Sequence, residues 1–289
     1  MRSKIHDYYL LTKPTIMLLV LLTGATSIVL EGSAVTQPLT FALALTGLFL
    51  TGGGANALNQ IFEKDIDAQM YRTRYRRPLP SGRLTIREAL VFSIVISTAG
   101  IALFALLFNW FSALLSLGTI LFYAFFYTLY LKPNTPQNIV IGGAAGAMAP
   151  VIAWTAVSGG FAATPWILFL IVFFWTPPHF WALALYLKDD YERANLPMMP
   201  NIKGAATTLN LILIHTIILF IITIALFIAQ PGWFYLIAAV ILGGFFIEKT
   251  IDARRIMEQR LYRRLFNYSI LHLFLLFVSM IIDDLIGVL

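Results

Sequence analysis

The sequence contains no cysteine and little charge. Because cysteine is absent from all 289 residues, disulfide bonds, thiolate metal sites and a cysteine nucleophile are excluded. Charged residues make up 12% of the chain, whereas a soluble globular domain carries roughly 25%. So little charge cannot cover a water-facing surface, and hydrophobic residues reach 59%. The composition therefore favours an integral membrane protein.

Recognisable targeting signals are also missing near the N-terminus. The first apolar stretch begins near Pro14, and neither an A-x-A cleavage site nor an Arg- and Ser-rich transit peptide precedes it. We therefore expect a multi-pass protein of a bacterial inner (plasma) membrane. An organellar protein whose presequence has been removed fits the same residues.

Long apolar runs divide the chain into membrane spans. A helix needs about 20 apolar residues to cross a bilayer core, and nine runs approach this length. They cover approximately residues 14–30, 40–62, 88–108, 111–131, 138–157, 166–187, 209–229, 232–248 and 267–287. The runs are continuously apolar rather than alternating, which argues against a β-barrel. We therefore predict an all-α integral membrane protein, a bundle of about nine transmembrane helices forming a single domain over residues 1–289.

Charge placement predicts how the spans are oriented. With a cytoplasmic N-terminus and alternating spans, all 20 Lys and Arg residues fall on the cytoplasmic side. The opposite loops carry only Glu31, Asp283 and Asp284. The positive-inside rule then predicts a periplasmic C-terminus, and the long basic connections place the active site near the cytoplasmic face. Basic loops beside anionic membrane lipid account for the net charge of +6, so no nucleic-acid partner is needed.

An acidic stripe marks the end of the second span. Asn59, Glu63 and Asp67 follow one another at intervals of four, so on a helix they lie along one face. Two carboxylates and an amide oxygen suit Mg²⁺, which takes oxygen ligands and retains substrate phosphates. A solvated helix end is the alternative, and it suffices for Asp65. For the stripe, metal binding is favoured because Asn59 lies inside an apolar run, where polar groups are costly and usually functional.

Basic residues follow the stripe directly. Residues 70–83 include Arg72, Arg76 and Arg77, and Lys132 stands in the connection after the fourth span. Arginine suits bidentate contacts to phosphate. A loop that only sets topology would explain these charges equally well, but it would need no neighbouring acids. We therefore predict a diphosphate site completed by metal.

A second polar segment follows the sixth span. Asp189 and Asp190 could hold a second metal or orient substrate. His179 and Tyr186 precede Asp190 by eleven and four residues, a spacing that predicts one shared helical face. Together with the first cluster, these residues suit the loss of diphosphate from a substrate, since fixed cations stabilise the leaving oxygens and aromatic rings can stabilise a carbocation.

These motifs resemble a known family. The pattern Asn59-x-x-x-Glu63-x-x-x-Asp67, followed by Arg72-Thr73 and Arg76-Arg77-Pro78-Leu79, resembles the first signature of the intramembrane UbiA-type prenyltransferases. The strings Phe174–Leu185, Lys188–Tyr191 and Thr135–Ala147 are similar to the haem O synthases (protohaem IX farnesyltransferases) of that superfamily. The similarity runs from about Lys13 to Gly204. Glu63 stands where many prenyltransferases carry Asp, and the second motif is less rich in Asp, so the number of metal ions stays open.

The resemblance implies a Mg²⁺-dependent reaction and assigns roles to residues. Farnesyl diphosphate would ionise, its cation would add to a vinyl group of protohaem IX (haem B), and water would complete haem O. Farnesyl diphosphate, haem B and membrane lipid are thus the implied partners, with a link to haem-copper oxidase assembly and haem A synthase. The implied roles are Mg-diphosphate binding by Asn59, Glu63 and Asp67, diphosphate contacts by Arg72, Arg76, Arg77 and Lys132, and a second signature of Lys188, Asp189 and Asp190, with Asp190 as a further Mg²⁺ ligand.

The haem-binding candidates are His179, Trp181 and Tyr186, which lie in or beside the second motif. An intramembrane histidine is a functional candidate, although a helix–helix hydrogen bond is the alternative. For His215 and His272 the hydrogen bond is favoured.

Two other functions share some of these features. An enzyme that prenylates 4-hydroxybenzoate or a quinone precursor would share the first motif but not the Trp175–Trp181 string. A transporter would carry charges near the bilayer midplane, whereas here they gather on one face.

Overall fold

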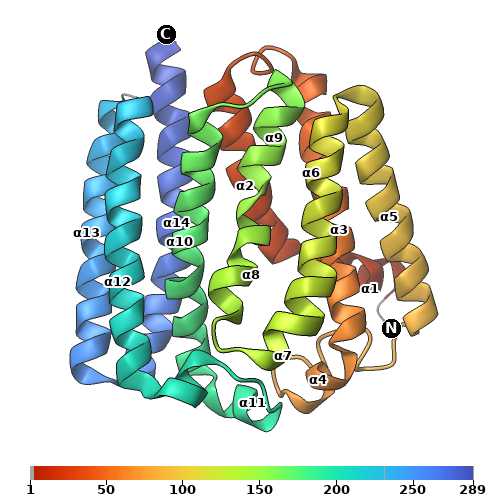
Figure 1. Cartoon of the computed structure of the whole chain (residues 1–289), viewed down its shortest axis with the longest axis vertical. Helices are drawn as coiled ribbons and strands as arrows, with labels where there is room; N and C mark the ends of the chain where they lie inside the picture. The colour runs from red at the N-terminus through yellow and green to blue at the C-terminus, as the bar shows by residue number, and fades with distance from the viewer. Residues whose placement is uncertain (1–2, 231, 289) are drawn as a thin grey trace.

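The computed structural model describes residues 3–230 and 232–288, and within these residues regular structure is entirely helical (Figure 1). In chain order the elements are α1 (Lys4–Leu11), α2 (Pro14–Glu31), α3 (Pro38–Phe62), α4 (Lys64–Gln69), α5 (Ile86–Leu107), α6 (Trp110–Leu121), the π-helix η1 (Phe122–Leu131), α7 (Lys132–Asn134), α8 (Asn138–Ala147), α9 (Ala149–Ser158), α10 (Ala163–Tyr186), α11 (Lys188–Arg193), α12 (Met199–Ala229), α13 (Trp233–Ile256) and α14 (Gln259–Val288). Nine helical stretches of the described chain are long and apolar enough to cross a membrane. The predicted all-α membrane fold with nine spans is confirmed.

Two of the spans are composite. The fourth runs from Trp110 to Asn134 through α6, η1 and α7, and the fifth runs from Asn138 to Ser158 through α8 and α9. Pro150 lies in the first turn of α9, where a missing N–H costs no helical hydrogen bond. These interruptions still leave each stretch long enough to span the bilayer.

The last three spans are longer than the apolar runs predicted. The structure extends them to 199–229, 233–256 and 259–287, so the expected long connection over residues 249–266 is mostly helical. Hydropathy marks only the part of a helix that lies in lipid, and a helix can continue beyond it into water. Gly204 interrupts α12 with a φ of 79°, a conformation that glycine adopts without steric cost.

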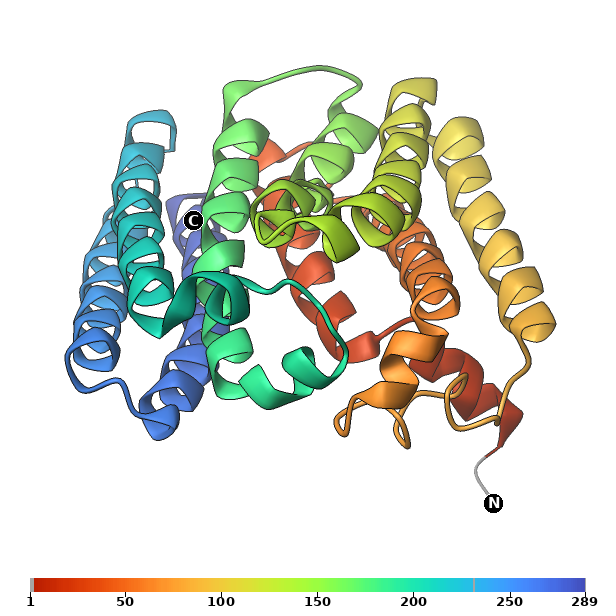
Figure 2. The ribbon, with the colours of Figure 1, turned by 60° about the horizontal axis from the view of Figure 1, so that its bottom comes forward.

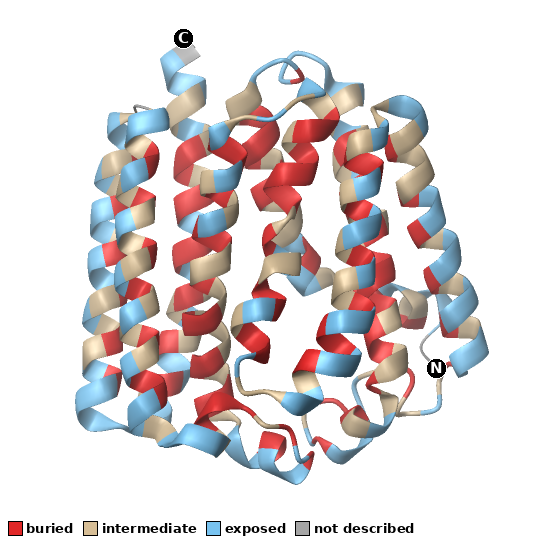
Figure 3. Cartoon of the chain, viewed as in Figure 1, coloured by how far each residue is buried: buried red, intermediate tan, exposed pale blue. Residues whose placement is uncertain are grey.

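The packed interior falls into two main clusters. One joins α8, α10, α12, α13 and α14, and the other joins α2, α3, α5, α6 and α9. Buried residues line the faces that helices turn toward one another, whereas exposed residues cover the outer faces of α5 and α13 (Figure 3). Many exposed side chains there are apolar, such as Leu106 and Ile237, as expected for a surface in contact with lipid.

Small residues let neighbouring helices approach closely. A Cβ on Gly54 of α3 would lie 2.0 Å from the hydroxyl of Ser97 on α5, and one on Gly47 would lie 2.7 Å from the Phe104 ring. Close packing of this kind is a main source of association between helices in membranes.

Short helices gather at one end of the bundle. α1, α4, α7 and α11 lie at the end that also holds the N-terminus, here called the basic end (Figure 1). Figure 2 turns this end toward the viewer and shows α11 and the α10–α12 connection lying across from α4 and the loop after it. Residues from the first and second polar segments therefore meet at the basic end.

Candidate active site

The acidic stripe lies where α3 ends. α3 stops at Phe62, Glu63 joins it to α4, and Asp67 lies within α4. Hydrogen bonds of helical spacing continue across the junction, since the Glu63 N–H donates to the Asn59 carbonyl at 3.0 Å and the Asp67 N–H to the Glu63 carbonyl at 2.8 Å. The three side chains consequently stay on one side, and all are at most 2% exposed. The predicted stripe is therefore present, although it crosses a junction between two helices.

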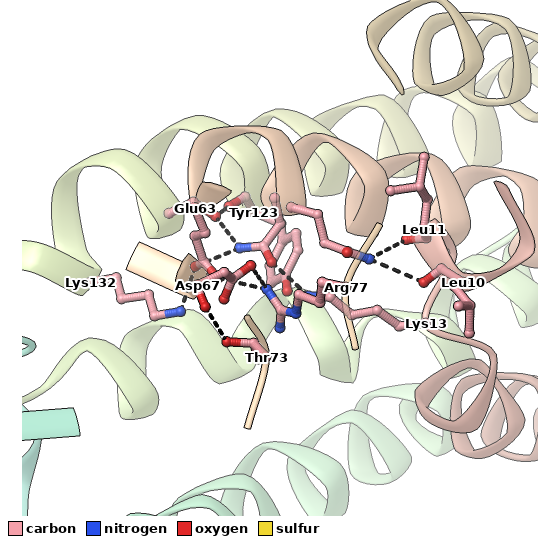
Figure 4. A network of polar contacts seen from close by, with 12 residues as sticks. Leu10, Leu11, Lys13, Glu63, Asp67, Thr73, Arg77, Tyr123 and Lys132 are labelled. Carbon is pink, nitrogen blue, oxygen red and sulfur yellow. Dashed lines mark hydrogen bonds and ion pairs between the residues drawn. The ribbon is translucent and has the colours of Figure 1, made fainter. Parts of the chain in front are cut away.

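Three cations surround the two carboxylates (Figure 4). The guanidinium of Arg77 pairs with Asp67 and lies 3.5 Å from Glu63, and the ammonium of Lys132 pairs with the other oxygen of Glu63. Lys13 donates to the amide oxygen of Asn59 at 2.6 Å. More positive than negative groups therefore converge on this point, which favours binding of an anion.

Lys13 reaches the cluster through an uncommon backbone conformation. It lies between α1 and α2 with a φ of 53°, in the left-handed region that non-glycine residues seldom occupy. Gln60 on α3 holds this junction by donating to the carbonyls of Leu10 and Leu11 at 3.1 and 3.0 Å (Figure 4). Sequence spacing could not predict this role of Lys13, because its contact with Asn59 joins residues 46 positions apart.

The π-helix η1 supplies a further side of the site. Thr128 donates to the Tyr123 carbonyl five residues earlier at 2.8 Å, and its hydroxyl accepts from the Asn59 amide at 3.0 Å. Asn59 also donates to Glu63 at 2.8 Å. π-helical turns are rare and often occur at functional sites. Here η1 leads into Lys132 and brings Tyr123 beside Lys13, with 6.0 Å between the ammonium and the ring centre.

Burial and charge act together on the ionisable groups. Burial opposes ionisation of Glu63, but the positive charges of Lys132, Lys13 and Arg77 outweigh it and lower the pKa of Glu63 to about 2. Burial and the nearby charge of Arg77 lower the pKa of Lys13 to about 7. Glu63 is therefore ionised at neutral pH, as a metal ligand must be. Added negative charge would favour the protonated form of Lys13.

An apolar cavity lies on the membrane side of the cluster. Its volume is about 130 Å³, and it lies between α2, α3, α6, α8 and α9. Asn56, Met17 and Tyr123 line the end near the charged side chains, while Leu48 and Ile152 lie deeper. Tyr123 thus contacts both the charged cluster and the apolar cavity. A molecule with a charged head and an apolar chain would fit these two adjoining sites.

The oxygen donors fit a hard divalent cation bound together with phosphate. Glu63 and Asp67 both approach Nη1 of Arg77, so their oxygens converge. The Asn59 amide nitrogen donates to Glu63 and its oxygen accepts from Lys13, so Asn59 orients the site and would offer its oxygen to a metal only after leaving Lys13. Among the described residues, no group of three or more His, Cys, Asp or Glu side chains is arranged to hold a metal. Mg²⁺ usually retains water and substrate phosphate among its ligands, so it needs only a small number of ligands from the protein.

The second motif lies against the arginine-rich loop. The two carboxylate oxygens of Asp190 accept from the N–H groups of Tyr71 and Arg72 at 3.0 and 3.1 Å, and Arg193 approaches at 3.6 Å. Asp190 is thereby bound to the loop backbone rather than grouped with Glu63 and Asp67. Lys188 and Asp189 are exposed.

The predicted single face of His179, Tyr186 and Asp190 is wrong. α10 ends at Tyr186, and Asp190 lies on the following helix α11. The side chains meet different neighbours, because His179 contacts Ser269 on α14 whereas Asp190 accepts from the backbone of Tyr71 and Arg72.

The arginines differ in their surroundings. Arg77 lies in the charged cluster, as predicted for a diphosphate contact. Arg72 is partly buried, and its Nε has no hydrogen-bond partner among the described residues. Arg76 is exposed, and its backbone is engaged on both sides, since its N–H donates to the Thr73 carbonyl at 3.1 Å and its carbonyl accepts from Arg83 at 2.9 Å. The structure therefore brings Arg77 and Lys132 to the stripe but leaves Arg76 outside it.

The haem-binding candidates lie away from the stripe. His179 stacks between Trp175 and Phe266, and its Nδ1 is 2.7 Å from the hydroxyl of Ser269 on α14. Trp181 is 1% exposed and packs edge-on against His215. Tyr186 lies 5.7 Å from the guanidinium of Arg263. These contacts tie α10 to α12 and α14.

Known proteins share both the sequence and the fold. The sequence model of the UbiA prenyltransferase family matches residues 18–278. A protein named protoheme IX farnesyltransferase from Erythrobacter litoralis is 44% identical over 284 residues, covering 96% of this chain and 92% of its own. A structure of digeranylgeranylglyceryl phosphate synthase superposes with a TM-score of 0.80 at 19% identity, covering 98% and 99% of the two chains. A UbiA homologue from Archaeoglobus fulgidus bound to DMAPP and Mg²⁺ gives 0.65 at 17% identity, covering 95% and 99%.

Proposed function

The chain belongs to the UbiA prenyltransferase family, and we propose that it transfers a farnesyl group from farnesyl diphosphate to a vinyl group of protohaem IX (haem B), with addition of water, giving haem O and diphosphate. The observation that carries the proposal is the 44% identity, over nearly the whole of both chains, to a protein named protoheme IX farnesyltransferase. The charged cluster beside an apolar cavity supports the prenyl-transfer half of the reaction.

Arg77 and Lys132 bind the diphosphate, joined by Lys13. All three ammonium or guanidinium groups already face the Asn59–Glu63–Asp67 stripe, so they need little reorientation when substrate arrives. Fixed cations that meet the charge developing on the leaving oxygens favour cleavage of the carbon–oxygen bond. Mg²⁺, held by the stripe, would neutralise the diphosphate and so make it a better leaving group. The structure of the Archaeoglobus homologue with DMAPP and Mg²⁺ supports this assignment.

The cavity between α2, α3 and η1 receives the prenyl chain. Its apolar lining excludes water from the allylic carbon until the acceptor arrives. The Tyr123 ring lies at the mouth of the cavity and stacks on Tyr127 with 5.4 Å between ring centres. Aromatic faces attract cations, so this pair stabilises positive charge on the prenyl group.

Residues around the second motif connect the diphosphate side of the site to the haem side. Asp190 keeps the loop that carries Arg72 in place through two backbone hydrogen bonds. Lys188 and Asp189 are exposed at the basic end and are available to approaching substrate. Haem binds on the side where α10 faces α12 and α14, near Trp181, Tyr186 and His179.

The protein lies in a bacterial inner membrane, with the N-terminus and the active site at the cytoplasmic face. The concentration of Lys and Arg at the basic end supports this orientation. Its product would supply a haem A synthase and the assembly of haem-copper oxidases.

Mass spectrometry of haem tests the proposal. Purified protein is incubated with haem B, farnesyl diphosphate and Mg²⁺, and we expect haem that has gained one farnesyl group and one hydroxyl group. Chelation of Mg²⁺ should abolish the product. A parallel reaction with 4-hydroxybenzoate is the control, and a product from that acid alone, with unmodified haem, would replace the proposal with an aromatic prenyltransferase.

A further inference from the structure

Tyr191 on α11 carries a buried hydroxyl that nothing in the described chain satisfies. The side chain is 1% exposed, and its oxygen has no hydrogen-bond partner among the described residues. Buried polar groups are paired in the great majority of cases, because an unpaired one loses its hydrogen bonds to water without replacement. The hydroxyl therefore requires a partner that the protein alone does not supply.

α11 lies across the basic end from the helix that carries Asp67. Figure 2 shows α11 opposite α4 and the loop after it, and Asp67 lies within α4. The residue before Tyr191, Asp190, holds the backbone of Tyr71 and Arg72 at 3.0 and 3.1 Å, so α11 and the arginine-rich loop form one packed unit. Tyr191 is therefore buried in the unit that carries the arginines, on the side of the site across from α4.

A second donor in the same region also lacks an acceptor. Nε of Arg72 is buried without a hydrogen-bond partner among the described residues. A phenolic O–H and a guanidinium N–H that are both unpaired where α11 meets the arginine-rich loop define a place for an anion with several acceptor oxygens. A diphosphate has such oxygens, and so do the propionates of haem. Inorganic pyrophosphate, which carries no porphyrin, distinguishes the two ligands in the test below.

We propose that Tyr191 is a further catalytic residue, whose hydroxyl donates a hydrogen bond to an oxygen of the diphosphate. The inference rests on the proposed function, because it takes the prenyl diphosphate as the ligand. When the carbon–oxygen bond breaks, its electron pair stays on the diphosphate. A donor already oriented toward that oxygen then binds more tightly than in the ground state. Together with Arg72, it extends the diphosphate site from α3 and η1 across to α11.

Tyr191→Phe tests the role, because it removes only the hydroxyl. We expect kcat for farnesyl transfer to fall about 10²-fold, as when a donor to a developing oxyanion is deleted, with KM for haem unchanged. Without substrate, the melting temperature of the variant should equal or exceed that of the wild type, since an unpaired buried hydroxyl is removed. The rise in melting temperature on adding Mg²⁺ and inorganic pyrophosphate should be smaller than in the wild type.

Tyr130→Phe is the matched control, because it removes the same hydroxyl group at a different site. Tyr130 lies on η1 and is 61% exposed. Normal kcat together with a normal pyrophosphate response in Tyr191→Phe would overturn the inference. A lower melting temperature of the substrate-free variant with an unchanged pyrophosphate response would also overturn it, in favour of a structural hydroxyl. If the wild type fails to farnesylate haem but the pyrophosphate response depends on Tyr191, the anion site stands and the proposed acceptor is wrong.

Discussion

At the scale of single residues, the site depends on how two carboxylates are shared between two cations. Glu63 pairs with Lys132 and Arg77, and the carboxylate of Asp67 pairs with Arg77, while Lys13 is held by the amide oxygen of Asn59. A divalent metal ion that enters must take carboxylate oxygens away from Arg77 and Lys132. An incoming diphosphate then offers its own oxygens to these two side chains. Binding of metal and of diphosphate should therefore support each other, because each compensates the charges that the other displaces.

Asp67→Asn and Glu63→Gln should each lower kcat/KM by about 10²-fold or more, because each removes one negative ligand from the metal site while keeping the side-chain shape. The Mg²⁺ concentration that gives half-maximal rate should rise in both variants. Initial rates over a Mg²⁺ titration measure the effect, and size-exclusion chromatography checks that the protein is folded. Asp65→Asn is the control, since Asp65 is exposed on the same helix. Near-normal Mg²⁺ dependence in both variants would show that the stripe does not bind the metal.

Arg77→Ala and Arg76→Ala form a second pair with opposite expectations. A hydrogen bond to a charged group contributes about 1.5–3 kcal/mol, so loss of Arg77 should raise KM for farnesyl diphosphate about tenfold or more, with a smaller change in KM for haem. Arg76 is exposed and outside the cluster, so its loss should change both constants less than threefold. Equal effects of the two substitutions would mean that the loop acts through its total charge.

Sequence patterns predicted which residues form the site but not which residues contact one another there. Asn59, Glu63 and Asp67 could be predicted because they recur at intervals of four residues, which places them on one face of a helix. Arg77 could be predicted because it follows them closely in the sequence. Lys13 and Thr128 could not, since their contacts with Asn59 span 46 and 69 residues of sequence. Sequence alone marks Tyr191 only as part of the second motif, because whether a buried hydroxyl has a partner depends on the three-dimensional structure.

At the scale of helices, apolar runs predicted which segments cross the membrane but not where each helix ends. α13 continues past residue 248 to Ile256, because Lys249 and the residues after it can be helical in water as well as in lipid. Conversely, the break at Leu187 falls within a stretch without glycine or proline, so no local signal marks it. That break is the reason that the second motif lies on a helix of its own.

The cavity between α2, α3 and α6 should select the length of the prenyl chain. At 1.5 Å per residue, the distance along α3 from Asn56 at the mouth to Leu48 at the deep end is about 12 Å. Leu48→Ala should deepen the cavity and increase the use of geranylgeranyl diphosphate relative to farnesyl diphosphate. Ser116→Leu should fill it and favour geranyl diphosphate, because Ser116 lines the same space.

Competition among the three diphosphates, read by the masses of the haem products, measures this selection. Leu48→Ala is expected to lower stability by about 2–5 kcal/mol, as do other truncations of buried leucines, so relative product yields are compared rather than absolute rates. The two substitutions act in opposite directions and control for each other. Unchanged preference in both folded variants would place the chain outside this cavity.

At the scale of the whole molecule, the basic end joins topology and chemistry. The same Lys and Arg residues that orient the spans also include those that face the acidic stripe, so the active site must lie on the side that retains positive charge. For this chain that side is predicted to be the cytoplasm. The α2–α3 and α13–α14 connections lie at opposite ends of the bundle (Figure 1). Val35 belongs to the first connection and Glu258 to the second.

Because the chain has no cysteine, single substitutions report the orientation directly. Val35 and Glu258 are both exposed, so Val35→Cys and Glu258→Cys should each be tolerated and reactive. A membrane-impermeant maleimide added to intact cells (spheroplasts, where an outer membrane is present) should label Val35→Cys. It should label Glu258→Cys only after the membrane is opened. The reverse pattern would place the charged cluster on the outer side, where cytoplasmic farnesyl diphosphate could not reach it without transport, and would require a different supply of substrate.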